Sequence, residues 1–142
     1  MDRRQFLGAG AAFGTVASLG ASRVAAQGKP LKIGILNDLS SVYSDYQGIG
    51  SKIAAELAVA DWSAKLGVPV EIIIADHQNK PDVGAGIARK WFDTEGVDVV
   101  MDVPNSAVAL AVLAVANEKN KAVIGSGAGA SVMTGPQCSK NF

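Results

Sequence analysis

One stretch of the chain, residues 31–47 (LKIGILNDLSSVYSDYQ), constrains the fold more than any other. It opens with an apolar run over residues 31–36, which is typical of a short buried strand. A polar loop follows, and the capping-box spacing of Ser44 and Gln47 predicts that a helix begins at about residue 45. This order of strand, loop and helix is the first unit of a parallel α/β sheet. Because ligands bind such sheets at the carboxyl ends of the strands, Ser41 and Tyr43 lie where a ligand would be held.

The same strand–loop–helix pattern recurs along the rest of the chain. Apolar runs predict further strands at residues 70–75, 97–101 and 122–125. Helical patterns occupy residues 45–66, 81–95 and 107–119. Four strands separated by three helices imply right-handed crossovers, so we predict an α/β fold in which a parallel sheet carries helices on both faces.

The helical patterns also predict which faces are buried. The helix over residues 107–119 is apolar nearly all round, which indicates deep burial but also more apolar side chains than one sheet can cover. We therefore expect an exposed apolar patch on this helix and an open edge at the strand that follows it. In the helix over residues 45–66, the side chains predicted to face the core recur at helical spacing: Ile49, Ile53, Leu57, Ala60 and Ala64.

Residues 1–26 have the pattern of an export signal. Arg3 and Arg4 precede an apolar run rich in glycine and alanine, and small residues end it at Ala25 and Ala26. This predicts a signal peptide cleaved after Ala26 and export from the cytoplasm. The Arg-Arg-x-Phe-Leu start is twin-arginine-like, and an ordinary secretory signal is the alternative. A membrane anchor is the weaker interpretation, since the run falls short of the ~20 strongly apolar residues that a span needs.

Charge and composition exclude several classes of partner. Three of the 13 basic residues and one of the 13 acidic residues lie in positions 1–26, so residues 27–142 carry a formal net charge of 10 − 12 = −2. With no basic patch, no nucleic-acid partner is expected. One histidine and one cysteine provide no metal-ligand cluster, so no metal and no cofactor are predicted. The lone cysteine, Cys138, is either free or separated from its partner.

Catalysis is not predicted either. His77 follows Asp76, but no G-x-S-x-G nucleophile elbow accompanies them, so we interpret His77 as a hydrogen-bonded surface residue. Residues 125–130 satisfy the pattern G-x-G-x-x-G/A directly after a strand. A nucleotide-binding Rossmann-like or flavodoxin-like enzyme, the alternative function, would need a helix after this loop. The other interpretations are a flexible turn, or a loop whose N–H groups face a small anionic ligand.

Ser106 lies between the strand over residues 97–101 and the helix over residues 107–119. Its position is that of an N-cap, which by itself requires no functional explanation. The same position offers a hydroxyl group and unpaired helix N–H groups to a ligand carboxylate, and the two roles are compatible.

Several segments together resemble the amino-terminal part of a known class of protein. The motifs lie at residues 32–44, 75–82, 100–110 and 125–138. In order and spacing they resemble a periplasmic substrate-binding protein of an ABC importer, of the branched-chain amino acid receptor type, which has the type I periplasmic binding fold. The resemblance covers nearly all of residues 31–142. It implies a receptor without catalysis that closes on a small carboxylate, amide or amino-acid-like ligand and delivers it to a membrane permease.

The resemblance also implies which residues meet the ligand. In the family, ligand carboxylates contact hydroxyl and backbone N–H groups after the third and fourth strands, and a side chain of the first loop covers the ligand. Gly129 stands where many amino acid receptors carry a hydroxyl residue, which argues against an α-amino acid. Family members are about two or three times as long, so residues 27–142 are expected to be an incomplete amino-terminal lobe. The expected ligand contacts are Ser41, Tyr43, Asn105, Ser106, Ala107, Ala128 and Gly129.

Overall fold

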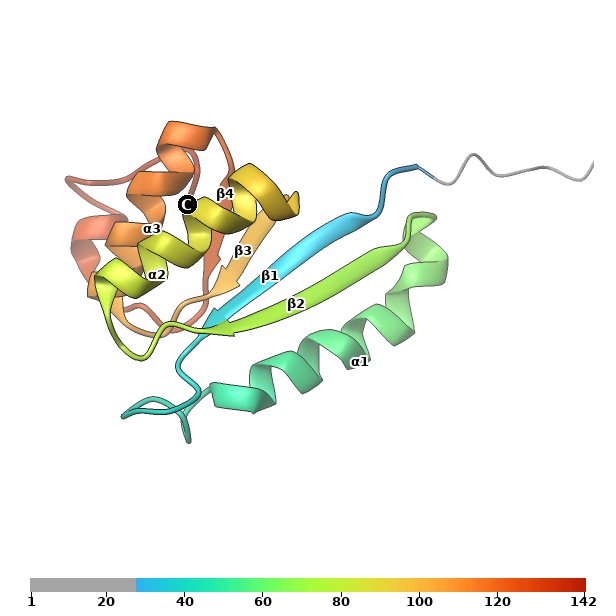
Figure 1. Ribbon diagram of the computed structural model, residues 1–142, viewed down its shortest axis with the longest axis horizontal. Helices are drawn as coiled ribbons and strands as arrows, with labels where there is room; N and C mark the ends of the chain where they lie inside the picture. The colour runs from blue at the N-terminus through green and yellow to red at the C-terminus, as the bar shows by residue number, and fades with distance from the viewer. Residues whose placement is uncertain (1–27) are drawn as a thin grey trace, which may run out of the picture.

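The structure is a computed structural model that describes residues 28–142, and the predicted signal over residues 1–26 lies outside them. Four parallel strands form one sheet in the order β2-β1-β3-β4 (Figure 1). The strands are β1 (Leu31–Asn37), β2 (Val70–Asp76), β3 (Val99–Asp102) and β4 (Ala122–Gly125). The helices are α1 (Gly48–Leu66), α2 (Pro81–Lys90) and α3 (Ser106–Lys119). A π-helical turn, η1 (Trp91–Glu95), extends α2, and a 3₁₀ turn, η2 (Ser131–Met133), follows β4.

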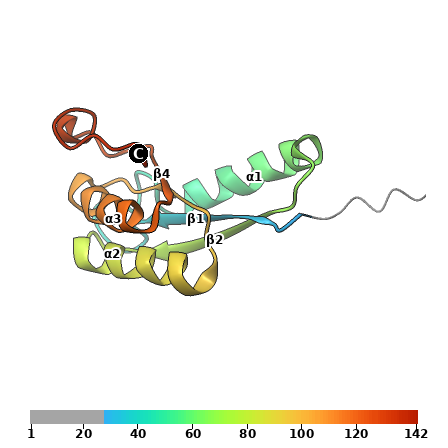
Figure 2. The same ribbon diagram turned by 90° about the horizontal axis from the view of Figure 1, so that it is seen from above.

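The two faces of the sheet carry different helices. Figure 2 shows α1 on one face, and α2 and α3 lie together on the other. Side chains alternate accordingly along β1, because successive residues of a strand point to opposite faces. Ile33 and Ile35 line spaces beside α1, whereas Leu36 belongs to the core under α2 and α3. The predicted α/β fold, with a parallel sheet between helices, is confirmed.

The main core lies between the sheet and the pair α2 and α3. Gly34 of β1 faces Trp91, and a Cβ atom at that glycine would lie 2.5 Å from carbon atoms of the indole ring. The glycine therefore lets the tryptophan pack directly on the strand. The prediction of an exposed apolar patch on α3 is wrong, because α2 packs along the side of α3 that the sheet leaves open. The buried side chains of α3 are Val108, Ala109, Val112, Leu113, Val115 and Ala116.

The apolar surface lies on α1 instead. The predicted core-facing residues Ile49, Ile53 and Leu57 are 58%, 51% and 63% exposed. The side of α1 that faces the sheet carries Val59 and Trp62, and between them and the strands is a cavity of about 330 Å³. The predicted face was wrong because α1 is apolar on more than one side, so periodicity could not identify the side that packs.

The outer edge of β4 is partly covered by the end of the chain. The backbone N–H of Val123 donates to the carbonyl of Asn141 at 2.7 Å, and the Asn141 side chain donates to the carbonyl of Lys121 at 2.7 Å. Phe142 packs close to Gly125. The predicted open edge is therefore only partly correct, since this short tail satisfies one strand N–H group.

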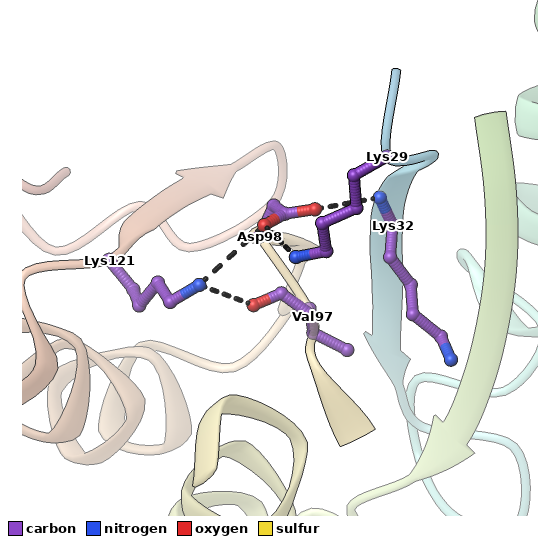
Figure 3. A network of polar contacts seen from close by, with 5 residues as sticks. All are labelled: Lys29, Lys32, Val97, Asp98 and Lys121. Carbon is purple, nitrogen blue, oxygen red and sulfur yellow. Dashed lines mark hydrogen bonds and ion pairs between the residues drawn. The ribbon is translucent and has the colours of Figure 1, made fainter. Parts of the chain in front are cut away.

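The amino edge of the sheet is held by Asp98 (Figure 3). Its carboxylate accepts from the backbone N–H of Lys32 at 3.0 Å and pairs with Lys29 at 3.2 Å and Lys121 at 3.7 Å. The Lys32 N–H group, with help from the two lysines, lowers the pKa of Asp98 below its usual 3.8. Lys121 also donates to the carbonyl of Val97 at 2.9 Å. This network joins the beginnings of β1, β3 and β4 at the edge opposite to the predicted ligand site.

Candidate ligand site at the carboxyl edge of the sheet

The carboxyl edge collects a polar residue from the end of each of three strands. β1 ends at Asn37, β2 at Asp76 and β3 at Asp102, and the loop after β4 begins with Ser126. Because all four strands are parallel, their loops meet at this one edge. The residues predicted to contact a ligand all lie in three of these loops or at the start of α3.

Asp38 organises the loop between β1 and α1. Its carboxylate accepts from the backbone N–H groups of Ser41 at 2.9 Å and Tyr43 at 3.0 Å, and from the Ser41 hydroxyl. Burial alone raises the pKa of Asp38, but the hydrogen bonds from Ser41, Tyr43 and Ser40 together lower it below 3.8. The Ser41 hydroxyl proton is thus committed to Asp38. The half-buried Tyr43 side chain donates no hydrogen bond within residues 28–142, so its phenol group remains available.

The predicted capping box is wrong. The Ser44 hydroxyl donates to the carbonyl of Ser41 at 2.6 Å, and α1 begins three residues later than predicted, at Gly48. Gln47 precedes α1 and makes no capping bond. Its amide instead donates to Asp102 Oδ1 at 2.5 Å and to Ser126 Oγ at 2.9 Å. Sequence spacing alone could not show that the glutamine reaches across the sheet instead of back to its own helix.

The start of α3 is capped by Asn105 and not by Ser106. Asn105 Oδ1 accepts from the backbone N–H of Ala107 at 2.7 Å and of Val108 at 3.0 Å. Ser106 is the first residue of the helix, and its Oγ accepts from the backbone N–H of Ala130 at 3.2 Å. The predicted cap was one residue off, because adjacent Asn and Ser residues suit the position equally well. Within residues 28–142, neither the hydroxyl group nor the backbone N–H group of Ser106 donates a hydrogen bond.

The loop after β4 lies beside Ser106. The N–H group of Ala130 binds the Ser106 hydroxyl, whereas those of Ala128 and Gly129 have no acceptor within residues 28–142. Within residues 126–142 the three-residue turn η2 follows the loop, and not the helix that a dinucleotide site needs. The geometry places the donor groups of Ser106, Ala128 and Gly129 in neighbouring segments. Their role in ligand contact stays a prediction, as do the roles of Ser41, Tyr43, Asn105 and Ala107.

His77 differs from its prediction as a surface residue, because its side chain is fully buried. Nδ1 accepts from the backbone N–H of Asn79 at 2.9 Å, and Nε2 has no partner within residues 28–142. Burial lowers the pKa of His77 from its usual 6.5, more than the nearby carboxylates of Asp38 and Asp76 raise it. A single polar residue in a loop carries no periodic signal, so the sequence could not reveal this burial.

Two further properties concern the described part of the chain. Across residues 28–142, no group of three or more His, Cys, Asp or Glu side chains is arranged to hold a metal ion. Among the helices of that same region, none combines the length and apolar character needed to cross a membrane.

Comparisons with known proteins agree with this architecture. A family described as periplasmic binding protein matches residues 30–142. A periplasmic binding protein from Burkholderia mallei is 44% identical, with a TM-score of 0.75 over 79% of this chain and 30% of its own. A branched-chain amino acid ABC transporter periplasmic ligand-binding protein from Burkholderia xenovorans is 43% identical, with a TM-score of 0.74 over 78% of this chain and 30% of its own.

A more distant structure shares only the fold. It is a solute-binding protein of an ABC transporter from Rhodopseudomonas palustris, in complex with 4-hydroxybenzoate. It is 22% identical, with a TM-score of 0.68 over 75% of this chain and 29% of its own. A search of curated proteins gave no match.

This chain therefore spans about 30% of the length of the solved relatives. Members of the matched family are substrate-binding receptors and not a class of enzyme. Because the family's pattern covers residues 30–142 and the relatives with this fold are 44% and 43% identical, the chain belongs to the periplasmic binding protein family.

Proposed function

We propose that this chain forms one wall of the binding cleft of an extracytoplasmic solute-binding receptor, which captures a small carboxylate, amide or amino-acid-like ligand for an ABC importer. The observation that supports the proposal is the convergence of unpaired donors at the carboxyl edge of the sheet. The hydroxyl and N–H groups of Ser106 lie at the amino end of α3, next to the loop that carries the unpaired N–H groups of Ala128 and Gly129. A helix amino terminus and exposed backbone N–H groups favour a bound carboxylate.

The same geometry favours a partly apolar ligand. Tyr43 supplies an aromatic side chain from the loop between β1 and α1, and its hydroxyl makes no hydrogen bond within residues 28–142. Small-ligand sites commonly combine such an apolar wall with a few donors that fix orientation. In this proposal the receptor acts in the periplasm, has no catalytic activity, and passes its ligand to a membrane permease.

A binding panel tests this function. The chain is titrated with 4-hydroxybenzoate, L-leucine, a small aliphatic amide, and a nucleotide. Binding is measured by isothermal titration calorimetry and by NMR chemical shifts of the backbone amides. We expect binding of one of the first three ligands and none of the nucleotide. Saturable nucleotide binding without any binding of a carboxylate or an amide would contradict the proposal and favour the Rossmann-like alternative.

A further inference from the structure

A buried carboxylate joins three loops at the candidate site. Asp102 is 6% exposed and ends β3. It accepts from Asn37 Nδ2 at 2.5 Å, from Gln47 Nε2 at 2.5 Å, and from the Ser126 hydroxyl. These donors come from the end of β1, the residue before α1 and the loop after β4. Asp102 forms no salt bridge within residues 28–142, so these neutral donors compensate its buried charge.

The backbone at this junction has an unusual conformation. Asp102 has φ of 84° and Val103 has φ of 50°, a region that residues other than glycine rarely occupy and that is least suited to a β-branched one. Val103 is fully buried, and its N–H group donates to the carbonyl of Leu36 at 3.0 Å. The turn directs the chain into Asn105 and Ser106 at the start of α3. The orientation of these residues therefore depends on the contacts that hold Asp102.

Gln47 is wedged between the loops after β3 and β4. A Cβ atom at Gly127 would lie 2.9 Å from Gln47 Oε1 and 3.1 Å from the Cα atom of Pro104. The glycine therefore lets the loop after β4 lie directly against the glutamine. Gln47 Oε1 is buried without a hydrogen-bond partner within residues 28–142, so the hydrogen bonds that fix the amide are those donated by Nε2.

We propose that Gln47 is a positioning residue of the ligand site, an inference that rests on the proposed function. By donating to Asp102 and Ser126, its amide holds the start of α3 and the loop after β4 at the spacing that brings the donors of Ser106, Ala128 and Gly129 together. Gln47 does not touch the ligand in this account. It acts by holding the β3 turn and the Gly127 loop against each other.

The first test replaces the amide with an apolar side chain of similar size. In Gln47→Leu, we expect the backbone amides of Ser126 and Ala130 to exchange with solvent about tenfold faster, because a hydrogen bond to a buried carboxylate is lost. The amide of Asp98, which bonds the carbonyl of Lys32 at the opposite edge, should keep its rate. Gln137→Leu, at an exposed glutamine, is the matched control and should change neither rate.

The second test uses proton uptake to distinguish hydrogen bonding from mere filling of space. Gln47→Glu places a second carboxyl group against Asp102, and two adjacent like charges repel. At pH 7 the amides of Ser126 and Ala130 should therefore lose protection relative to the original chain at the same pH. As the pH falls towards 4, the introduced carboxyl group takes up a proton and can donate one hydrogen bond to Asp102, so part of the relative protection should return.

The outcomes separate this inference from the proposed function. Unchanged exchange at Ser126 and Ala130 in Gln47→Leu, or a deficit in Gln47→Glu that stays constant with pH, would overturn the positioning role. If Gln47→Leu accelerates exchange of the Asp98 amide as much as exchange of the Ser126 and Ala130 amides, the substitution has loosened the whole fold. The pH response of Gln47→Glu then decides whether Gln47 is a positioning residue. A chain that binds no probe of the panel would contradict the proposed function alone, because the exchange measurements require no ligand.

Discussion

His77 shows how one buried side chain couples stability to pH. Since burial lowers its pKa below 6.5, the unfolded chain takes up a proton at a higher pH than the folded chain does. The free energy of unfolding is therefore highest above pH 6.5 and falls as the pH falls below it. The pKa values of Asp38 and Asp76 are lowered from 3.8, so their stabilising contribution is lost only in a separate and more acidic range.

We predict that stability falls between pH 7 and pH 5 with a slope of at most about 1.4 kcal/mol per pH unit, the limit for one proton. His77 is the only histidine of the chain, so His77→Gln should abolish this slope. The glutamine can still accept from the N–H of Asn79. Denaturant unfolding of both chains across this range is the measurement, and an identical slope in the variant would assign the effect to another group.

Alanine substitutions at the neighbouring residues Asn105 and Ser106 should affect different properties, stability at Asn105 and ligand binding at Ser106. Ser106→Ala should weaken binding of a carboxylate by about 1.5–3 kcal/mol, the range for a hydrogen bond to a charged group. Asn105→Ala should instead cost about 1 kcal/mol of stability, because Asn105 caps α3. Calorimetric titration with the best-binding carboxylate of the panel, together with thermal unfolding, measures both. An unchanged dissociation constant for Ser106→Ala would contradict a ligand contact by Ser106. Its hydroxyl would then serve only to accept the hydrogen bond from the Ala130 N–H group.

Helices α3 and α1 differ in how deeply their leucine side chains are buried, and so in how much those side chains stabilise the fold. Leu113 of α3 is 3% exposed, whereas Leu57 of α1 is 63% exposed. We predict that Leu113→Ala lowers the free energy of unfolding by about 2–5 kcal/mol, as expected for a buried leucine. The same substitution at Leu57 should change it by no more than about 0.5 kcal/mol. Equal losses in chemical denaturation would mean that the outer side of α1 is buried in solution.

The helices also show what the sequence could and could not predict. The strands, their parallel direction and the polar edge could be predicted from apolar runs of strand length and from the residues that end them, whereas the order of the strands in the sheet was not predicted. The packing side of α1 could not be predicted, because apolar residues recur on more than one side of that helix. At the site, the loops around Ser106 and Gly129 were predicted, whereas Asp102 and Gln47 were missed as partners. Only the fold reveals the hydrogen bond from the Gln47 amide to the Asp102 carboxylate, since the two residues lie 55 positions apart in the sequence.

At the scale of the whole molecule, the fold has one well-packed side and one thinly covered side. The cavity of about 330 Å³ beside α1 adjoins a second of about 240 Å³, and Ala55 and Met101 line both. On the sheet, Ile124 of β4 is 52% exposed. The donors proposed to bind the ligand lie on the well-packed half, at α3 and the loop after β4, where the surrounding core can hold them in place.

Export of the molecule can be tested independently of binding. We predict that replacing Arg3 and Arg4 together with lysine blocks export, because a twin-arginine pathway requires both arginines. A general secretory signal needs only positive charge and would tolerate the change. Cell fractionation that finds the double variant exported as well as the original chain would refute the twin-arginine route, while leaving export itself intact.

The most direct test of the proposed site is a residue-resolved titration of the chain with the carboxylate or amide of the panel that binds best, followed by amide chemical shifts. One wall of a cleft leaves a ligand partly solvated, so we predict weak binding, with shifts concentrated at Ser106, Ala128 and Gly129. The amides around Trp62, beside the apolar cavity, serve as the internal control and should not move. Shifts confined to the neighbourhood of Trp62, with none at the start of α3 or in the loop after β4, would contradict the proposed site.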